Sequence, residues 1–138
     1  MIFGIVYTLV GLMGFVPGLV QSPPVDAPRL AVSTAYGYMF GLFPLNLLHD
    51  LVHIVVGVIG IGVAGRFAAA LMYCRVVAVV FAILTVMGLI PGLDTTLGLI
   101  PIFGADVALH AVTTVASAYF GWFAPEVTGR RAAAHTPA

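Results

Sequence analysis

Long apolar segments alternate with short polar interruptions along the chain, and this pattern predicts helices that cross a membrane. A helix needs about 20 apolar residues to cross the hydrocarbon core of a bilayer. Segments of that kind cover 2–20, 45–64, 67–90 and 102–123. Prolines lie near their ends, at positions 17, 44, 91 and 101, where proline suits a first helical turn or ends a helix. The pattern therefore predicts an all-α bundle of four transmembrane helices.

Composition strengthens this prediction, because 62% of the 138 residues are hydrophobic and only 7% are charged. Soluble domains carry roughly 25% charged residues. The chain is therefore expected to be an integral membrane protein in contact with the lipid bilayer. Its formal net charge of zero argues against a nucleic-acid partner, since phosphate binding needs clustered Lys and Arg. The single cysteine, Cys74, cannot form an internal disulfide.

The connection after the first apolar segment is long and has two parts. Residues 21–28 are polar and rich in proline, whereas residues 30–43 are apolar and contain two tyrosines. The second part is too short for another span. It either lies in the membrane interface, where tyrosines are enriched, or extends the second helix backwards into a long, tilted one. Gly41 and Pro44 favour the interfacial alternative.

Arginine positions predict the orientation of the chain. Arg66 and Arg75 lie between or near the second and third segments, and Arg130 and Arg131 follow the fourth, which leaves Arg29 on the other side. The positive-inside rule then places both termini in the cytoplasm. We expect one transmembrane domain over 1–128 and a mobile cytoplasmic tail over 129–138.

Two parts of the sequence repeat. Residues 13–19 (MGFVPGL) match 87–93 (MGLIPGL), and residues 41–45 (GLFPL) match 98–102 (GLIPI). The repeats cover about 2–65 and 66–123, with two helices each. An even number of helices predicts parallel repeats related by a pseudo-twofold axis along the membrane normal. Continuing the second match without a gap makes His53 equivalent to His110.

Ionisable residues interrupt the second and fourth apolar segments, and they form the candidate site. His49, Asp50 and His53 lie in the second segment, and Asp106 and His110 lie in the fourth. Asn46 and Asp106 suit the positive end of a helix, as a cap or a first-turn residue. Residues four apart share a helix face, so His49 faces the same way as His53, and Asp106 as His110. An ionisable side chain at membrane depth is a functional-site hypothesis by default.

Three interpretations of this polar cluster compete. The side chains satisfy one another and fix how the hairpins dock, as polar groups do between membrane helices. Alternatively, His53 and His110 bind a cofactor, as axial ligands of a haem b or as a ligand of a chlorophyll-type magnesium. As a third possibility, His49, His53, Asp106 and His110 supply the nitrogens and the carboxylate that suit zinc. A proton path across the membrane is disfavoured, because the inner halves of both helices lack ionisable residues.

No P-loop, nucleophile elbow or His-Glu-x-x-His motif appears in the sequence. We therefore expect no enzymatic activity. The favoured function is an accessory or scaffold subunit that contacts other membrane-protein subunits or forms a homo-oligomer. The alternative is a haem-, chlorophyll- or metal-binding membrane protein that uses His53 and His110.

The motif Asn46-Leu-Leu-His49-Asp50-Leu-Val-His53, the repeated Gly-Leu-x-Pro and the later Asp106-x-x-x-His110 resemble a bacterial family of small four-helix membrane proteins classed as a domain of unknown function. The resemblance covers most of the chain, from the first to the fourth segment. It implies a four-helix membrane fold and no particular activity. It also implies that the protein lies in the cytoplasmic membrane of a bacterium or in a membrane derived from it. The family is expected to carry Asn more often than Asp at position 50, so this chain departs from it there.

Overall fold

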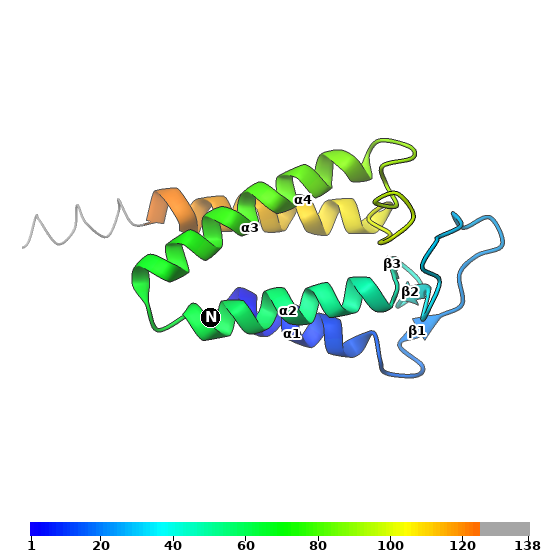
Figure 1. Cartoon of the computed structure of the whole chain (residues 1–138), viewed down its shortest axis with the longest axis horizontal. Helices are drawn as coiled ribbons and strands as arrows, with labels where there is room; N and C mark the ends of the chain where they lie inside the picture. The colour runs from blue at the N-terminus through cyan, green and yellow to red at the C-terminus, as the bar shows by residue number, and fades with distance from the viewer. Residues whose placement is uncertain (125–138) are drawn as a thin grey trace, which may run out of the picture.

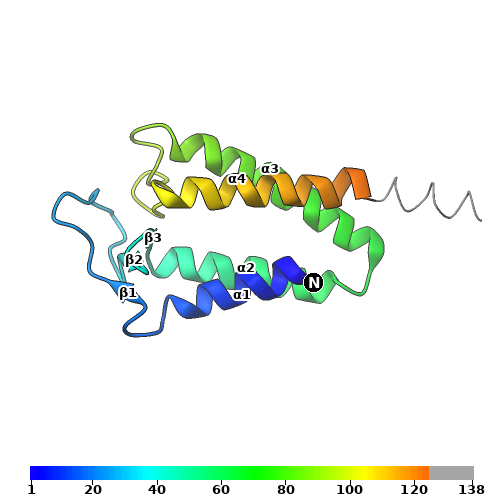
Figure 2. The ribbon, with the colours of Figure 1, turned by 180° about the vertical axis from the view of Figure 1, so that it is seen from behind.

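Two helical hairpins lie side by side in the computed structural model, which describes residues 1–124 (Figure 1). The first hairpin consists of α1 (Ile2–Met13) and α2 (Leu47–Val63), and the second of α3 (Phe67–Gly88) and α4 (Ala105–Ala118). A short π-helical segment, η1 (Tyr119–Phe123), continues α4. Seen from behind, α1 and α4 lie on the near face and α2 and α3 behind them (Figure 2).

The predicted bundle of four membrane spans is wrong. Within residues 1–124, α3 is the one helix long and apolar enough to cross a membrane, with 22 residues. At 1.5 Å per residue, α1 reaches about 18 Å and α2 about 26 Å, short of a hydrocarbon core of about 30 Å. The first helix ends early because Gly14 and Pro17 follow it and Gly18 adopts a φ of 91°, which favours glycine and stops a helix.

A small antiparallel sheet fills part of the long first connection and also departs from the all-α prediction. Its strands β1 (Val20–Gln21), β2 (Gly37–Met39) and β3 (Phe43–Leu45) pair in that order. Val20 lies opposite Met39, and Gly37 lies opposite Leu45. The prediction that residues 30–43 extend α2 backwards is therefore wrong, because two strands occupy part of this segment. Its placement in the membrane interface stays a prediction. Apolar residues with frequent tyrosines suit a pleated, half-buried strand equally well.

Small residues bring α1 and α2 into close contact in the first hairpin. A Cβ atom on Gly4 would lie 2.5 Å from the backbone nitrogen of Ile61, and one on Gly57 would meet Thr8. Neither position has space for a larger side chain, so the two backbones approach each other as helices do at small-residue interfaces. This close approach fixes which face of α2 turns towards the second hairpin.

The hairpins meet through a small apolar core and leave most of their apolar surface exposed. Tyr7 of α1 packs with Val77 and Phe81 of α3 in that core. Large apolar side chains on all four helices remain exposed, such as Leu9 at 54% and Val115 at 71%. An extended apolar surface of this kind is typical of proteins that contact lipid or other proteins.

Equivalent positions of the sequence repeat have equivalent surroundings in the two hairpins. The His53 ring lies 5.3 Å from the Tyr7 ring, and the His110 ring lies 5.1 Å from the ring of Phe81, the counterpart of Tyr7. Gly18 and its counterpart Gly92 have φ values of 91° and 89°. These two glycines thus have matching backbone conformations. The starts of α2 and α4 lie at the same end of the molecule (Figure 1).

Candidate functional site

Asn46 anchors the start of α2 and thereby positions the site. Its side-chain oxygen accepts a hydrogen bond from the His49 backbone at 3.0 Å, which caps the helix as predicted. Its amide nitrogen donates to the carbonyls of Val32 and Leu99, both at 2.7 Å. Asn46 is completely buried and bonds to a loop of each hairpin. These bonds therefore hold the first turn of α2, which carries His49, against the loops of both hairpins.

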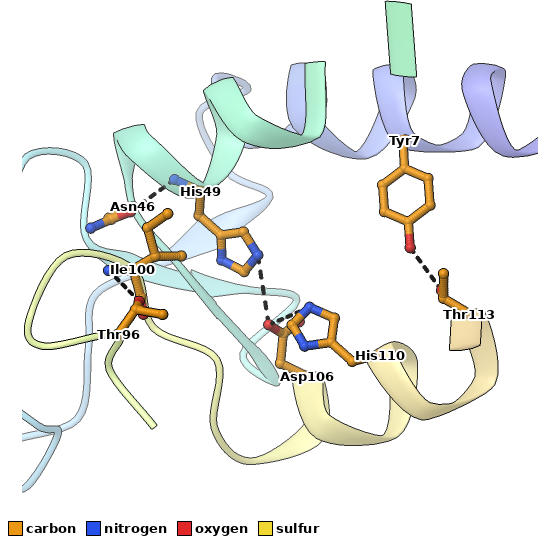
Figure 3. A network of polar contacts seen from close by, with 8 residues as sticks. All are labelled: Tyr7, Asn46, His49, Thr96, Ile100, Asp106, His110 and Thr113. Carbon is orange, nitrogen blue, oxygen red and sulfur yellow. Dashed lines mark hydrogen bonds and ion pairs between the residues drawn. The ribbon is translucent and has the colours of Figure 1, made fainter. Parts of the chain in front are cut away.

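His49, Asp106 and His110 converge at the interface of the hairpins (Figure 3). Asp106 lies in the first turn of α4, and its Oδ2 lies 3.6 Å from Nε2 of His49 and 3.5 Å from Nε2 of His110. All three side chains are buried, with exposures of 3–4%. These separations exceed the 2.7–3.2 Å of an ordinary N–H···O hydrogen bond. The three groups therefore converge on one point without bonding tightly to each other.

His53 and Asp50 lie beside this triad and make different contacts. The His53 ring stacks on the His49 ring with centroids 4.5 Å apart and lies outside the group of converging donor atoms. The Asp50 carboxyl lies against Gly14 of α1, where any added Cβ would clash with it. Neither carboxyl oxygen of Asp50 has a hydrogen-bond partner among residues 1–124. Asp50 is thus a buried carboxyl that packs against α1 and lies outside the donor group.

Burial dominates the electrostatics of the cluster. It lowers the pKa of His49 well below its usual range, and the neighbouring His53 and His110 lower this pKa further. Burial lowers the pKa of His53 to about 4, with a further contribution from His110, and also brings that of His110 to about 4. The pKa values of Asp50 and Asp106 rise to about 7 for the same reason. At neutral pH the imidazoles are therefore neutral, as ligands of a metal ion must be.

The triad geometry fits one metal ion. One donor atom from each of His49, Asp106 and His110 lies within 4.8 Å of the other two. Ligands about 2.0–2.1 Å from a tetrahedral zinc lie roughly 3.3 Å apart, close to the 3.5 and 3.6 Å between the Asp106 oxygen and the two nitrogens. Nδ1 of His49 and of His110 and Oδ2 of Asp106 have no hydrogen-bond partner among the described residues. These orphaned polar atoms are expensive to bury, and an ion would satisfy the carboxylate oxygen.

A groove of about 360 Å³ between α1 and α4 opens beside the triad. Its walls are apolar side chains of α1, α4 and the strand region, and the triad, Asp50 and His53 lie along it. The Tyr7 hydroxyl and the Thr113 hydroxyl form a hydrogen bond of 2.7 Å that ties α1 to α4 partway along the groove (Figure 3). One polar end and long apolar walls make this groove a candidate ligand site.

The structure brings together all six residues of the predicted polar cluster at one end of the hairpins. The sequence repeat makes His53 equivalent to His110. The same alignment also makes His49 equivalent to Asp106, and these two lie 3.6 Å apart. Sequence reasoning missed the bridge between Tyr7 and Thr113, because both residues are common in apolar helices.

A family model described as "Domain of unknown function (DUF4383)" matches residues 1–123. No curated protein and no solved structure matches the chain. The matched range includes both hairpins and every residue of the site. The chain therefore belongs to the DUF4383 family, a domain of unknown function.

Proposed function

We propose that the protein binds one divalent transition-metal ion of the zinc type between its two hairpins, through His49, Asp106 and His110. The convergence of three buried donor atoms within 4.8 Å carries this proposal. Two imidazole nitrogens and one carboxylate oxygen are a ligand set that zinc accepts. Because His49 belongs to α2 and the other two ligands to α4, the ion would join the hairpins.

Among the metal and cofactor alternatives, the geometry favours a single ion over a haem or chlorophyll-type group. Nε2 of both triad histidines approaches the same Asp106 oxygen, so the donors surround one point. The His53 ring lies flat against His49, which supports a packing role. Binding of a haem or pigment by His53 and His110 stays a prediction, and a Soret band in the spectrum of the purified protein would favour it.

We further propose that the protein is integral to a membrane through α3, which is long and apolar enough to cross one. The exposed apolar side chains on the remaining helices support contact with lipid. Location in a bacterial cytoplasmic membrane, and a role as a non-enzymatic accessory or scaffold subunit, stay predictions. The same apolar surface would serve a partner subunit or a second copy of this chain.

Zinc titration of the metal-stripped protein in detergent tests the metal site. We expect one ion per chain, and visible bands of tetrahedral cobalt when Co²⁺ replaces zinc. The variant His49→Phe should weaken zinc binding more than about 100-fold, because losing an outer-shell partner alone typically costs 10–100-fold. His53→Phe is the matched control, since it keeps a ring stacked on His49 and should change the affinity less than about tenfold.

Two outcomes would contradict the proposal. The first is a purified protein that binds less than stoichiometric zinc with all its histidines intact. The second is an equal loss of zinc affinity in His49→Phe and His53→Phe, which would show that His49 contributes no more to zinc binding than the neighbouring His53. Asp106→Asn serves as a second variant, because it keeps the side-chain shape while removing the charge.

A further inference from the structure

The groove between α1 and α4 has the dimensions of a site for a single hydrocarbon chain. It follows α1 from Met13 to Ile2 and α4 from Asp106 to Ala116, so it extends about 17 Å along α1 at 1.5 Å per residue. Its volume of about 360 Å³ lies at the small end of the range for ligand pockets. Two acyl chains or a fused ring system would not fit this space, whereas one extended chain would.

The polar groups of the groove gather at one end. Asp106, His110 and His49 lie at the end of the groove near Met13, beside the first turns of α2 and α4. Towards the other end the walls are Val6, Ile2 and Ala116. A ligand that fills this space must therefore be an amphiphile, with a small polar head at the triad and an apolar tail between the helices.

The net charge of the metal site determines which head group of a ligand it can bind. Two neutral imidazoles and one carboxylate leave a divalent ion with a net charge of +1, and burying an uncompensated charge among apolar walls is costly. The triad supplies three ligands, and zinc prefers four. Asp50 is not the missing ligand, because its carboxyl lies against Gly14 and outside the donor group. An anionic oxygen from a ligand would both complete the coordination and neutralise the site.

We propose that the groove binds one long-chain fatty acid, with its carboxylate as the fourth ligand of the ion and its acyl chain between α1 and α4. This inference rests on the proposed metal site and adds the class of its ligand. The carboxylate head and the single tail match the charge and the shape of the groove. Opening along the face of α1 and α4, the groove admits such a chain from the side.

The test uses the full-length protein, delipidated in a non-ionic detergent and loaded with zinc, and measures myristate binding by calorimetry. We expect one myristate per chain. Removal of zinc should weaken binding at least tenfold, and methyl myristate, which lacks the negative charge, should bind at least tenfold more weakly than myristate. With Co²⁺ in the site, myristate should shift the cobalt absorption bands, and the methyl ester should not.

Variants in the groove test the binding of the acyl tail separately from the coordination of the carboxylate head. Val6→Trp fills the groove from α1, and we expect it to abolish myristate binding while zinc binding stays unchanged. Leu9→Trp is the matched control, since Leu9 is 54% exposed on the same helix and does not line the groove. Val112→Trp repeats the test from α4, where Val112 is 66% exposed, so that folding is not at risk.

Different negative results would overturn different parts of the proposal. Stoichiometric zinc without myristate binding overturns the fatty-acid inference and leaves the metal site intact. Equal binding of myristate and its methyl ester overturns the role of the carboxylate. Myristate binding without any zinc binding overturns both the coordination by the carboxylate and the proposed function. Equal effects of Val6→Trp and Leu9→Trp overturn the placement of the tail.

Discussion

Replacing Asn46 by alanine removes three hydrogen bonds at once, and their expected cost follows from the structure. The capping bond to the His49 backbone is worth about 1 kcal/mol. The carbonyls of Val32 and Leu99 lose their bonds to the side-chain amide, and each unsatisfied buried carbonyl costs about 1–3 kcal/mol. Some relaxation towards water is expected, so we predict a loss of about 3–5 kcal/mol in the free energy of unfolding.

Asn46→Ser separates the two contributions, because serine caps a helix as well as asparagine does and cannot reach the two carbonyls. We expect Asn46→Ser to retain about 1 kcal/mol of the stability that Asn46→Ala loses. The assay is reversible unfolding of the metal-free protein in mixed detergent and denaturant, followed by far-UV circular dichroism. A loss below about 1 kcal/mol in Asn46→Ala would refute the reasoning, since it would mean that the two carbonyl bonds contribute nothing.

Two further predictions use other buried polar groups. Burial raises the pKa of Asp50 to about 7, so the contribution of this carboxyl to stability is complete below about pH 4 and is lost as the pH rises through 7. Asp50→Asn should therefore match the parent at pH 4 and exceed it at pH 8 in the melting temperature of metal-free protein. The gain should grow between about pH 4 and pH 7 and level off above pH 7, where the carboxyl is ionised in both the folded and the unfolded protein. A difference that stays constant across this range would contradict the assignment. Thr113→Val removes the hydrogen bond to Tyr7 and should cost about 1 kcal/mol in the same unfolding assay. Thr114→Val removes a bond within α4 only and should cost less, so equal losses would show that the bridge does not hold the helices together.

The sequence predicted some helix limits well and others poorly. The apolar pattern predicts the third segment at 67–90, and α3 ends at Gly88. It predicts the first segment at 2–20, although α1 ends at Met13. Apolar composition reports how a segment partitions between water and lipid, whereas a helix end depends on local turn geometry. The turn at Gly14, Pro17 and Gly18 and the pairing of Val20 with Met39 leave no trace in hydropathy.

The members of the candidate site could be predicted, but their pairing could not. Helical spacing correctly puts His49 and His53 on one face of α2, where their rings stack. Which of them meets α4 depends on the depth at which the hairpins dock, and bonds to residues remote from the motif help to set this depth. Asn46 contributes by joining loops of both hairpins. Such a long-range bond has no periodic signature in a single sequence.

The repeat has a chemical consequence. Tyr7 contacts its own counterpart Phe81 at 5.3 Å, and His49 contacts its counterpart Asp106 at 3.6 Å, so each pair joins two equivalent positions of the sequence repeat. In a dimer of two identical hairpins that docked in the same way, each of these side chains would face a copy of itself, either imidazole against imidazole or carboxylate against carboxylate. A mixed pair needs two halves with different sequences. Carrying both halves in one chain therefore permits the buried contact between an imidazole and a carboxyl group.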